Sequence, residues 1–414
     1  MIKNQAKSSK KRKETSGKAV YFDYASSAPL REGVKEYIRK SLQKTEANPG
    51  AIHELGAEGA RAVSAARAEV ASAFSVSPAE VVFTGSATES VAIAILGTVR
   101  QFAPSKAEIV TTTIEHPAVL ENCKLLQREG YKVTFVAPDA NGVVSVESIK
   151  KAITPKTVLV SVMYAQNEIG TIMPIRDIAK IVRHEKKRRK DAREKLPIYF
   201  HTDATQAVAY LDIQFDLLGV DMLSFNSAKL GGPKGIGALV KSRLITLVPI
   251  YVGGGQESGL RSGTTAPMLV GGFATALSEA RASRERECAR LSVLRDALIR
   301  DLRKQFPRCR INGDEHIRLP NNVNVSFPDF DSEVLLLELD ARGIAVSSVS
   351  ACKNEETFAS HVLAALYPKE KKIWATIRIS LGYDSTKAEC DYFLKSLKEV
   401  FKKYEKYKPG SETF

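Results

Sequence analysis

Short apolar runs alternate with amphipathic stretches from about residue 80 to residue 226. Runs rich in Val, Ile, Leu and Phe predict strands, and stretches with apolar residues at helical spacing predict helices. This alternation indicates a mostly parallel sheet with helices on both faces, and the continuous apolar strands fit a sheet buried on both sides. The predicted strands are 81–84, 109–113, 133–137, 157–164, 198–202 and 222–226, and the predicted helices are 89–101, 118–129, 146–153 and 175–195.

The pattern changes after about residue 270, where a long amphipathic helical stretch is followed by shorter elements. This change predicts a smaller α+β domain. We therefore expect a disordered basic tail at 1–18, a large domain at 19–270 and a small domain at 271–408, with the first residues of the large domain free to pack on the small one. The predicted elements of the small domain are helices 272–305, 333–341 and 387–404 and strands 323–327, 344–348 and 376–380.

The composition is that of a globular protein. Of 414 residues, 44% are hydrophobic and 26% are charged, which excludes a disordered chain, a collagen and a disulfide scaffold. No apolar run reaches the roughly 18 residues that a membrane span needs. The lysine-rich start has no apolar core, so it does not resemble a secretory signal.

The net charge of +14 raises the question of an acidic partner or nucleic acid. Three segments hold the whole excess: 3–18, 185–195 and 395–408. A solvated tail or helix face is one interpretation, because no aromatic residues are interleaved with the charges. Docking of an acidic protein or RNA is the other.

The five cysteines are widely spaced and form no C-x-x-C pair. This argues against zinc-ribbon, thioredoxin-like and haem-attachment sites, and it favours a reducing cytoplasm. The cysteines are Cys123, Cys288, Cys309, Cys352 and Cys390.

Three segments carry residues that suit chemistry. Residues 84–90 follow a strand and open a helix, where free N–H groups bind an anion, although plain N-capping fits equally well. Asp203 ends a strand at the edge where α/β sheets bind ligands. Its carboxylate could bind a ligand there, or it could cap the next helix. Lys229 ends another strand. It is either a surface lysine or a desolvated amine that is able to form a Schiff base. An anion site, a carboxylate and an amine together match the needs of pyridoxal 5'-phosphate (PLP).

Several motifs, in order along residues 20–404, resemble those of the cysteine desulfurases in the class V aminotransferase family of PLP enzymes. The resemblance implies a large PLP-binding domain with a mostly parallel seven-stranded sheet, plus a smaller α+β domain. The motifs are Tyr21–Ala25, Gly85–Ser90, Glu115–His116, Asn167–Gly170, Asp203–Gln206, Arg261–Thr264, Ser347–Cys352 and Ile377–Ser380.

The resemblance also implies roles for single residues. Lys229 would bind PLP covalently, Asp203 would pair with the pyridine nitrogen and Gln206 would donate to the phenolic oxygen. His116 would stack on the ring and move protons. Asn167 and Arg378 would bind the substrate carboxylate. The other residues implied for the cofactor are Ala87, Thr88, Asn226, Ser227 and Thr264, the last lent by the second subunit of a homodimer.

Cys352 separates this chemistry from ordinary transamination. A buried structural cysteine is the alternative, since that is the commonest fate of Cys. Against it, the segment around Cys352 is small and polar, and Lys353 favours the thiolate. The resemblance implies that Cys352 attacks the substrate sulfur and carries a persulfide, on a loop like that of the longer-loop branch of the family.

The sequence departs from the family in two places. The family commonly has Ser-Gly-His before the lysine, whereas Asn226, Ser227 and Ala228 stand here. We therefore expect weaker cofactor retention, with the chemistry kept. The basic stretch at 185–195 looks like an insertion.

The resemblance thus implies an enzyme that converts L-cysteine to L-alanine and an enzyme-bound persulfide, with no metal, and the cysteine usage favours the cytoplasm. The sulfur acceptor would be an iron–sulfur scaffold protein or a tRNA-thiolating enzyme. We expect neither a membrane nor direct nucleic-acid contact. A selenocysteine lyase-like PLP enzyme and a non-catalytic scaffold or RNA-binding homologue are the alternatives.

Overall fold

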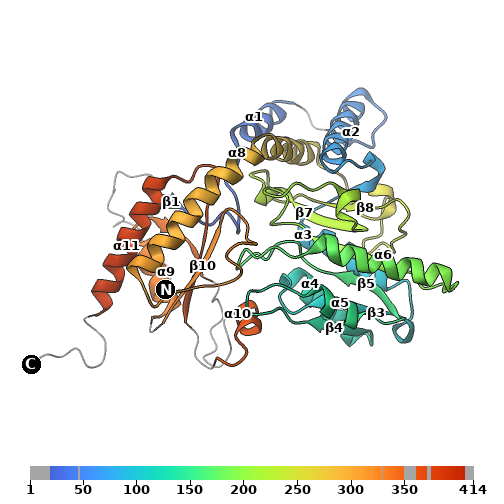
Figure 1. The fold of residues 1–414 in the computed structure, drawn as a ribbon. Helices are drawn as coiled ribbons and strands as arrows, with labels where there is room; N and C mark the ends of the chain where they lie inside the picture. Colours follow the sequence, from blue (N-terminus) through green and yellow to red (C-terminus); the bar gives the residue numbers. More distant parts are fainter. Residues whose placement is uncertain (1–18, 45–46, 329, 349–359, 371–373, 406–414) are drawn as a thin grey trace, which may run out of the picture.

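The computed structural model describes residues 19–44, 47–328, 330–348, 360–370 and 374–405. Within them, seven strands form the larger sheet in the order β2-β8-β7-β6-β5-β3-β4 (Figure 1). The strands from β7 to β4 are parallel, whereas β8 is antiparallel to both of its neighbours. The predicted fold class is confirmed. The strands are β2 (Val81–Thr84), β3 (Glu108–Thr112), β4 (Lys132–Val136), β5 (Thr157–Ser161), β6 (Tyr199–Asp203), β7 (Met222–Asn226) and β8 (Gly237–Lys241).

Helices cover both faces of this sheet. The face with Ile109 and Leu159 packs against α3 and α4, and the face with Val110 and Phe200 packs against α2 and α6. Each strand therefore buries side chains on both sides, which explains its continuous apolar sequence. The helices of this part are α1 (Glu32–Ser41), α2 (Glu54–Phe74), α3 (Ala87–Val99), α4 (Pro117–Arg128), α5 (Val146–Ala152), α6 (Ile175–Asp191) and α7 (Phe215–Leu218).

A second, antiparallel sheet has the strand order β12-β13-β10-β9 and its own core. The helices α8, α9 and α11 contribute to that core. The elements of this part are β9 (Arg310–Ile311), β10 (Asn322–Phe327), β11 (Ile344–Ala345), β12 (Ser347–Ser348), β13 (Ala375–Ser380), α8 (Pro267–Gln305), α9 (Ser332–Asp340), α10 (His361–Leu366) and α11 (Lys387–Glu405).

The first strand, β1 (Val20–Tyr21), pairs with β11 near the other end of the chain, and these two strands form a separate small sheet that packs on the second core. One helix connects the two parts of the fold. The long helix α8 packs on α1 and α2 with its first half and on the second core with its second half (Figure 1). In contrast, α10 packs on the core of the larger sheet although it follows β12 in sequence.

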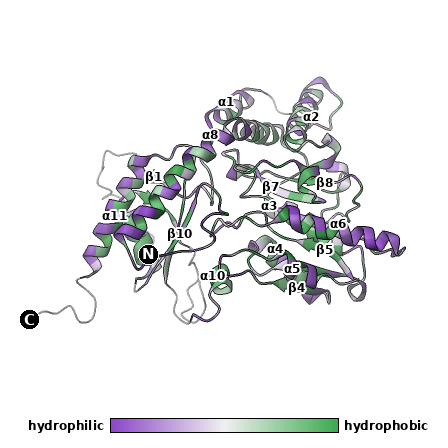
Figure 2. Ribbon diagram, viewed as in Figure 1, coloured by the Kyte–Doolittle hydropathy of each residue, from purple (hydrophilic) through white to green (hydrophobic). Residues whose placement is uncertain are grey.

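Several parts of the structure differ from the sequence-based prediction. Strand β8 is not predicted because it follows a glycine-rich loop, and helices α1 and α2 are not predicted because they precede the regular alternation. The short elements β1, β9, α7 and α10 are also absent from the prediction, since each has too few residues to show a pattern. The predicted strand 344–348 is two short strands, β11 and β12, that belong to different sheets. Figure 2 shows the buried strands as hydrophobic and the C-terminal half of α6 as hydrophilic.

The aromatic cluster under β7 provides a test of the fold. Phe225 is fully buried, and its ring centroid lies 5.0 Å from that of Phe74 and 5.2 Å from that of Phe273. We expect Phe225→Ala to lower the free energy of unfolding by about 3–5 kcal/mol in urea titrations, because it leaves a cavity. Val293→Ala, at an exposed position of α8, is the control and should change it by less than about 0.5 kcal/mol. Equal effects of the two variants would contradict this packing.

Candidate active site

A pocket of about 390 Å³ lies at the carboxyl ends of β5, β6 and β7 and the N-terminus of α3. This is the edge at which open α/β sheets bind ligands. Nine residues implied by the resemblance line it together: Ala87, Thr88, His116, Asn167, Asp203, Gln206, Asn226, Lys229 and Arg378.

Lys229 ends a short 3-10 turn directly after β7. Its Nζ donates a hydrogen bond to the carbonyl oxygen of Ser26. Burial, together with the nearby Arg378 guanidinium, lowers the pKa of Lys229 to about 8, although Asp23 and Asp203 act in the opposite direction. About a tenth of this amine is therefore neutral, and nucleophilic, at pH 7.

Asp203 is the last residue of β6 and is 6% exposed. Its Oδ1 accepts a hydrogen bond from the backbone N–H of Thr205 at 2.9 Å. Two residues earlier, His201 is hydrogen-bonded through its two ring nitrogens to Ser161 and Ser224 on the neighbouring strands, each at 2.9 Å. Burial lowers the pKa of His201 to about 3. A neutral imidazole thus cross-links β5, β6 and β7 just below the carboxylate.

His116 caps α4, because its Nδ1 accepts a hydrogen bond from the N–H of Ala118 at 3.0 Å. In the neutral ring the proton is therefore on Nε2. Burial lowers the pKa of His116, and Lys229 and His361 act in the same direction, whereas Asp203 opposes them. The imidazole is thereby favoured in the neutral form, able to donate from one nitrogen only.

The pocket contains donors suited to a phosphate. The first amides of a helix have no intrahelical acceptor, and Ala87 and Thr88 begin α3 at the pocket wall. Gly237 of β8 passes so close that a Cβ there would lie 2.9 Å from the nitrogen of Ala87. Asn226 accepts from the N–H of Lys229 through Oδ1, at 3.3 Å, which leaves its NH2 group as a donor. The amine, carboxylate and donor set fit PLP.

Arg378 reaches the pocket from β13 of the second sheet. Its guanidinium donates to Oδ1 of Asp23 at 3.0 Å, to Oγ of Ser26 at 2.6 Å and to the carbonyl oxygen of Asn167 at 2.9 Å. The side chain is 9% exposed and its Nε has no partner among the described residues. A fixed, incompletely paired guanidinium of this kind is suited to bind a carboxylate.

Three predicted residues are not among those that line the pocket. Ser227 is buried and its Oγ faces Gly232, where a Cβ would approach to 2.0 Å. Its side chain therefore points toward Gly232, and the contact of Ser227 with the cofactor stays a prediction. Thr264 is exposed and lies elsewhere on the surface. Cys352 lies outside the described residues.

Sequence reasoning missed several contacts around the pocket. Asp23 belongs to a quoted motif, but nothing in the sequence shows that it pairs with Arg378. The start of α10 contacts the sequence neighbours of two pocket-lining residues. Ser360 donates to Oε2 of Glu168 at 2.6 Å, and His361 Nε2 is 2.9 Å from the carbonyl oxygen of Glu115. The residues that follow 349–359 in sequence are thus anchored beside His116 and Asn167.

Comparison with known proteins agrees with this geometry. The Aminotransferase class-V family model matches residues 20–393. Cysteine desulfurase IscS of Dictyoglomus turgidum is 37% identical over 94% of this chain and 96% of its own length, and that of Methanosarcina thermophila is 38% identical over 95% of each. A solved NifS-like protein has 35% identity and a TM-score of 0.84 over 93% of this chain and 99% of its own.

The chain therefore belongs to the class V aminotransferase family and, within it, to the cysteine desulfurases. Enzymes of this group depend on PLP, as the residues of the pocket require.

The lowered pKa of Lys229 can be tested directly. Acetic anhydride reacts with the neutral amine only, so labelling of Lys229 in the cofactor-free protein should rise with pH around a midpoint of about 8. In the urea-unfolded chain the midpoint should move to roughly 10.4, the value of a free lysine. Mass spectrometry of the Lys229 peptide measures both. Equal midpoints in the folded and unfolded chains would contradict burial as the cause.

Proposed function

We propose that this enzyme removes sulfur from L-cysteine, releases L-alanine and keeps the sulfur as a persulfide on Cys352. The observation that carries the proposal is the convergence of Lys229, Asp203 and Arg378 in one pocket. An amine, a carboxylate and a guanidinium are what a PLP enzyme needs to act on an amino acid. A relative of known structure is titled "SspA in complex with cysteine", at 33% identity and a TM-score of 0.74.

The described residues divide the work. Lys229, Asp203 and Gln206 would hold the cofactor, with its phosphate at Ala87, Thr88 and Asn226. When bound, PLP supplies an electron sink for the charge that develops at the substrate α-carbon.

Each step then has a group of this chain to serve it. Arg378 and Asn167 would fix the substrate carboxylate, which aims the α-hydrogen at the pocket interior. The neutral amine of Lys229 would take the α-proton and later return a proton to the product carbon. The Nδ1 of neutral His116 accepts a hydrogen bond from Ala118, so this imidazole would donate only through Nε2.

The chemistry of sulfur transfer is assigned to Cys352. Its thiolate would attack the substrate sulfur, the carbon–sulfur bond would break with its electron pair left on carbon, and a new sulfur–sulfur bond would remain on the enzyme. The described residues on either side of 349–359 support this role. Ser347 pairs with Arg378 on one side, and His361 contacts Glu115 on the other, so these flanking residues lie beside segments that line the pocket.

The sulfur acceptor is proposed as a protein thiol, on an iron–sulfur scaffold or on a tRNA-thiolating enzyme. The four described cysteines are free, which suits a reducing compartment such as the cytoplasm. Among the described residues, no helix combines the length and the apolar character needed to cross a bilayer.

We also propose a homodimer in which Thr264 serves the pocket of the second subunit. Tyr251 and Val252 are 51% and 85% exposed, and Tyr251 forms a bridge to Arg261 in the same motif as Thr264. Exposed apolar residues beside a site-forming loop are typical of a subunit interface.

The role of Cys352 is tested by Cys352→Ser. This variant should keep the cofactor absorbance and its change on adding L-cysteine, because Lys229 and Arg378 remain. Sulfide release with a thiol reductant should fall by at least about 100-fold, since the nucleophile is lost. Cys288→Ser, at a half-buried position near Tyr210, is the matched control and should keep its turnover. Full sulfide release by Cys352→Ser would refute the assignment.

The competing selenocysteine lyase is distinguished by the substrate. The wild-type enzyme should turn over L-cysteine, and a strict requirement for L-selenocysteine would favour the lyase instead. A purified protein that binds no PLP would favour a non-catalytic homologue.

The dimer is tested by Val252→Glu. Sedimentation of the wild-type holoenzyme should give a mass of about twice 45.3 kDa, and the variant should shift toward 45.3 kDa because a buried carboxylate is costly. Leu217→Glu, at an exposed leucine of α7, should leave the mass unchanged. A monomeric wild-type enzyme that is fully active would contradict the shared site.

A further inference from the structure

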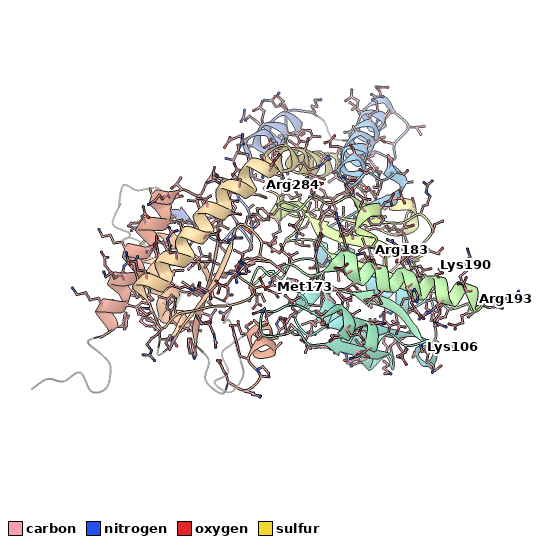
Figure 3. All side chains as sticks on the ribbon, viewed as in Figure 1. Lys106, Met173, Arg183, Lys190, Arg193 and Arg284 are labelled. Carbon is pink, nitrogen blue, oxygen red and sulfur yellow. The ribbon has the colours of Figure 1, made fainter. Side chains whose placement is uncertain are left out.

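The end of α6 farthest from the pocket carries a concentration of cations that the proposed chemistry does not use. Six exposed residues make up this surface, which we name the basic tip: Lys106, Lys156, Lys187, Lys190, Arg193 and Lys195. Figure 3 shows Lys190 and Arg193 pointing outward at the end of the helix, with Lys106 on the same side of the molecule.

The acidic residues nearby are used by other cations. Arg188 pairs with both Glu185 and Glu194, at 2.8 and 2.7 Å. Lys186 pairs with Asp221, and Arg189 pairs with Glu185. Within the described chain, none of the six cations of the basic tip forms an ion pair, and Asp191 is the one acidic residue of 185–195 without a partner. The charge of the tip is therefore open to a ligand.

The tip is held rigidly. Arg189 is 3% exposed beneath it and donates to the carbonyl oxygens of Leu196 and Pro197, each at 3.2 Å, and of Thr154 at 3.0 Å. Lys156 in turn donates to the carbonyl oxygen of Ser105, which brings Lys106 beside the helix end. Three segments that are distant in sequence thus present their cations on one surface.

Two simpler explanations do not account for all the cations of the basic tip. Cations at a helix C-terminus offset the helix dipole, but that effect acts only within the last turn. It does not involve Lys106 and Lys156, which lie on other segments. A surface that serves solubility carries interspersed charges of both signs. Most acidic residues near the basic tip already form ion pairs, so the tip does not have this mixed character.

The chemistry of the tip favours a phosphate backbone over a protein surface. Stable protein interfaces need a buried apolar or aromatic centre, and the residues from Lys187 to Lys195 offer only charged side chains and Ala192. A basic helix end in a chain of pI about 9.4 is the electrostatic footprint of nucleic-acid binding. The absence of aromatic residues from this stretch argues against base stacking.

We propose that the basic tip binds the phosphate backbone of RNA without reading its sequence. This revises the expectation from sequence alone, which could not show that the acidic residues are already paired. Helix α6 has 17 residues and is about 25 Å long, and it begins eight residues after Asn167 of the pocket. RNA at the tip would therefore leave the pocket open to cysteine.

The test uses the full-length holoenzyme and a fluorescein-labelled 20-nucleotide poly(U) RNA, followed by fluorescence anisotropy from 50 to 300 mM KCl. The variant Lys187→Glu/Lys190→Glu/Arg193→Glu should bind at least tenfold more weakly at 50 mM. Its plot of log K against log salt should be shallower by roughly 2, because about 0.7 is expected for each lost phosphate contact with a single strand. Sulfide release with a reductant should match that of the wild type.

The matched control is Lys395→Glu/Lys398→Glu/Lys402→Glu on α11, which changes net charge equally at exposed positions. It should weaken RNA binding less than twofold. No binding by the wild type at 50 mM, or equal losses in both triple variants, would overturn the proposal. Displacement of the RNA by poly-glutamate at equal charge concentration would also overturn it, and would point to an acidic protein instead.

Discussion

The pocket depends on one buried guanidinium that joins the two sheets. Arg378 comes from β13, yet its hydrogen bonds go to Asp23 and Ser26 near the start of the chain and to Asn167 after β5. Removing a partner from a buried charge costs several kcal/mol, because the remaining charge is left uncompensated. Three segments are therefore held in register by a group whose Nε has no partner among the described residues. The same residue binds the fold together and presents charge to the pocket.

The sequence was sufficient for six of the seven strands of the larger sheet, because their signals are local. Continuous apolar runs mark β2 to β7, and Asp203 and Lys229 stand where β6 and β7 end, so their meeting follows from parallel strands alone. The boundaries of these strands agree with prediction to within about three residues. Strand β8 was not predicted, because an antiparallel strand that follows a glycine-rich loop breaks the alternation of strands and helices.

Contacts between distant segments could not be read from the sequence. The pairing of Asp23 with Arg378 and the docking of α10 on the larger sheet depend on the three-dimensional path of the chain. Ser227 shows the limit in another way. Its position beside Lys229 suggested the cofactor, but the turn after β7 directs its hydroxyl to Gly232. Likewise, the sequence does not show that the acidic residues near the basic tip are paired with other cations.

The pairing of β1 with β11 has a consequence for how the enzyme is made. Val20 lies against Ile344, and the second core contains both Phe22 and residues of α11. Contacts of such sequence separation cost the most chain entropy to close and form late. On the ribosome, the first residues must wait until nearly the whole chain has been synthesised. Because Asp23 and Ser26 follow directly after β1 and Arg378 is near the end, the substrate side of the pocket is completed only when synthesis is nearly finished. A truncated chain would therefore lack not only β13 but also the arrangement of its own first residues.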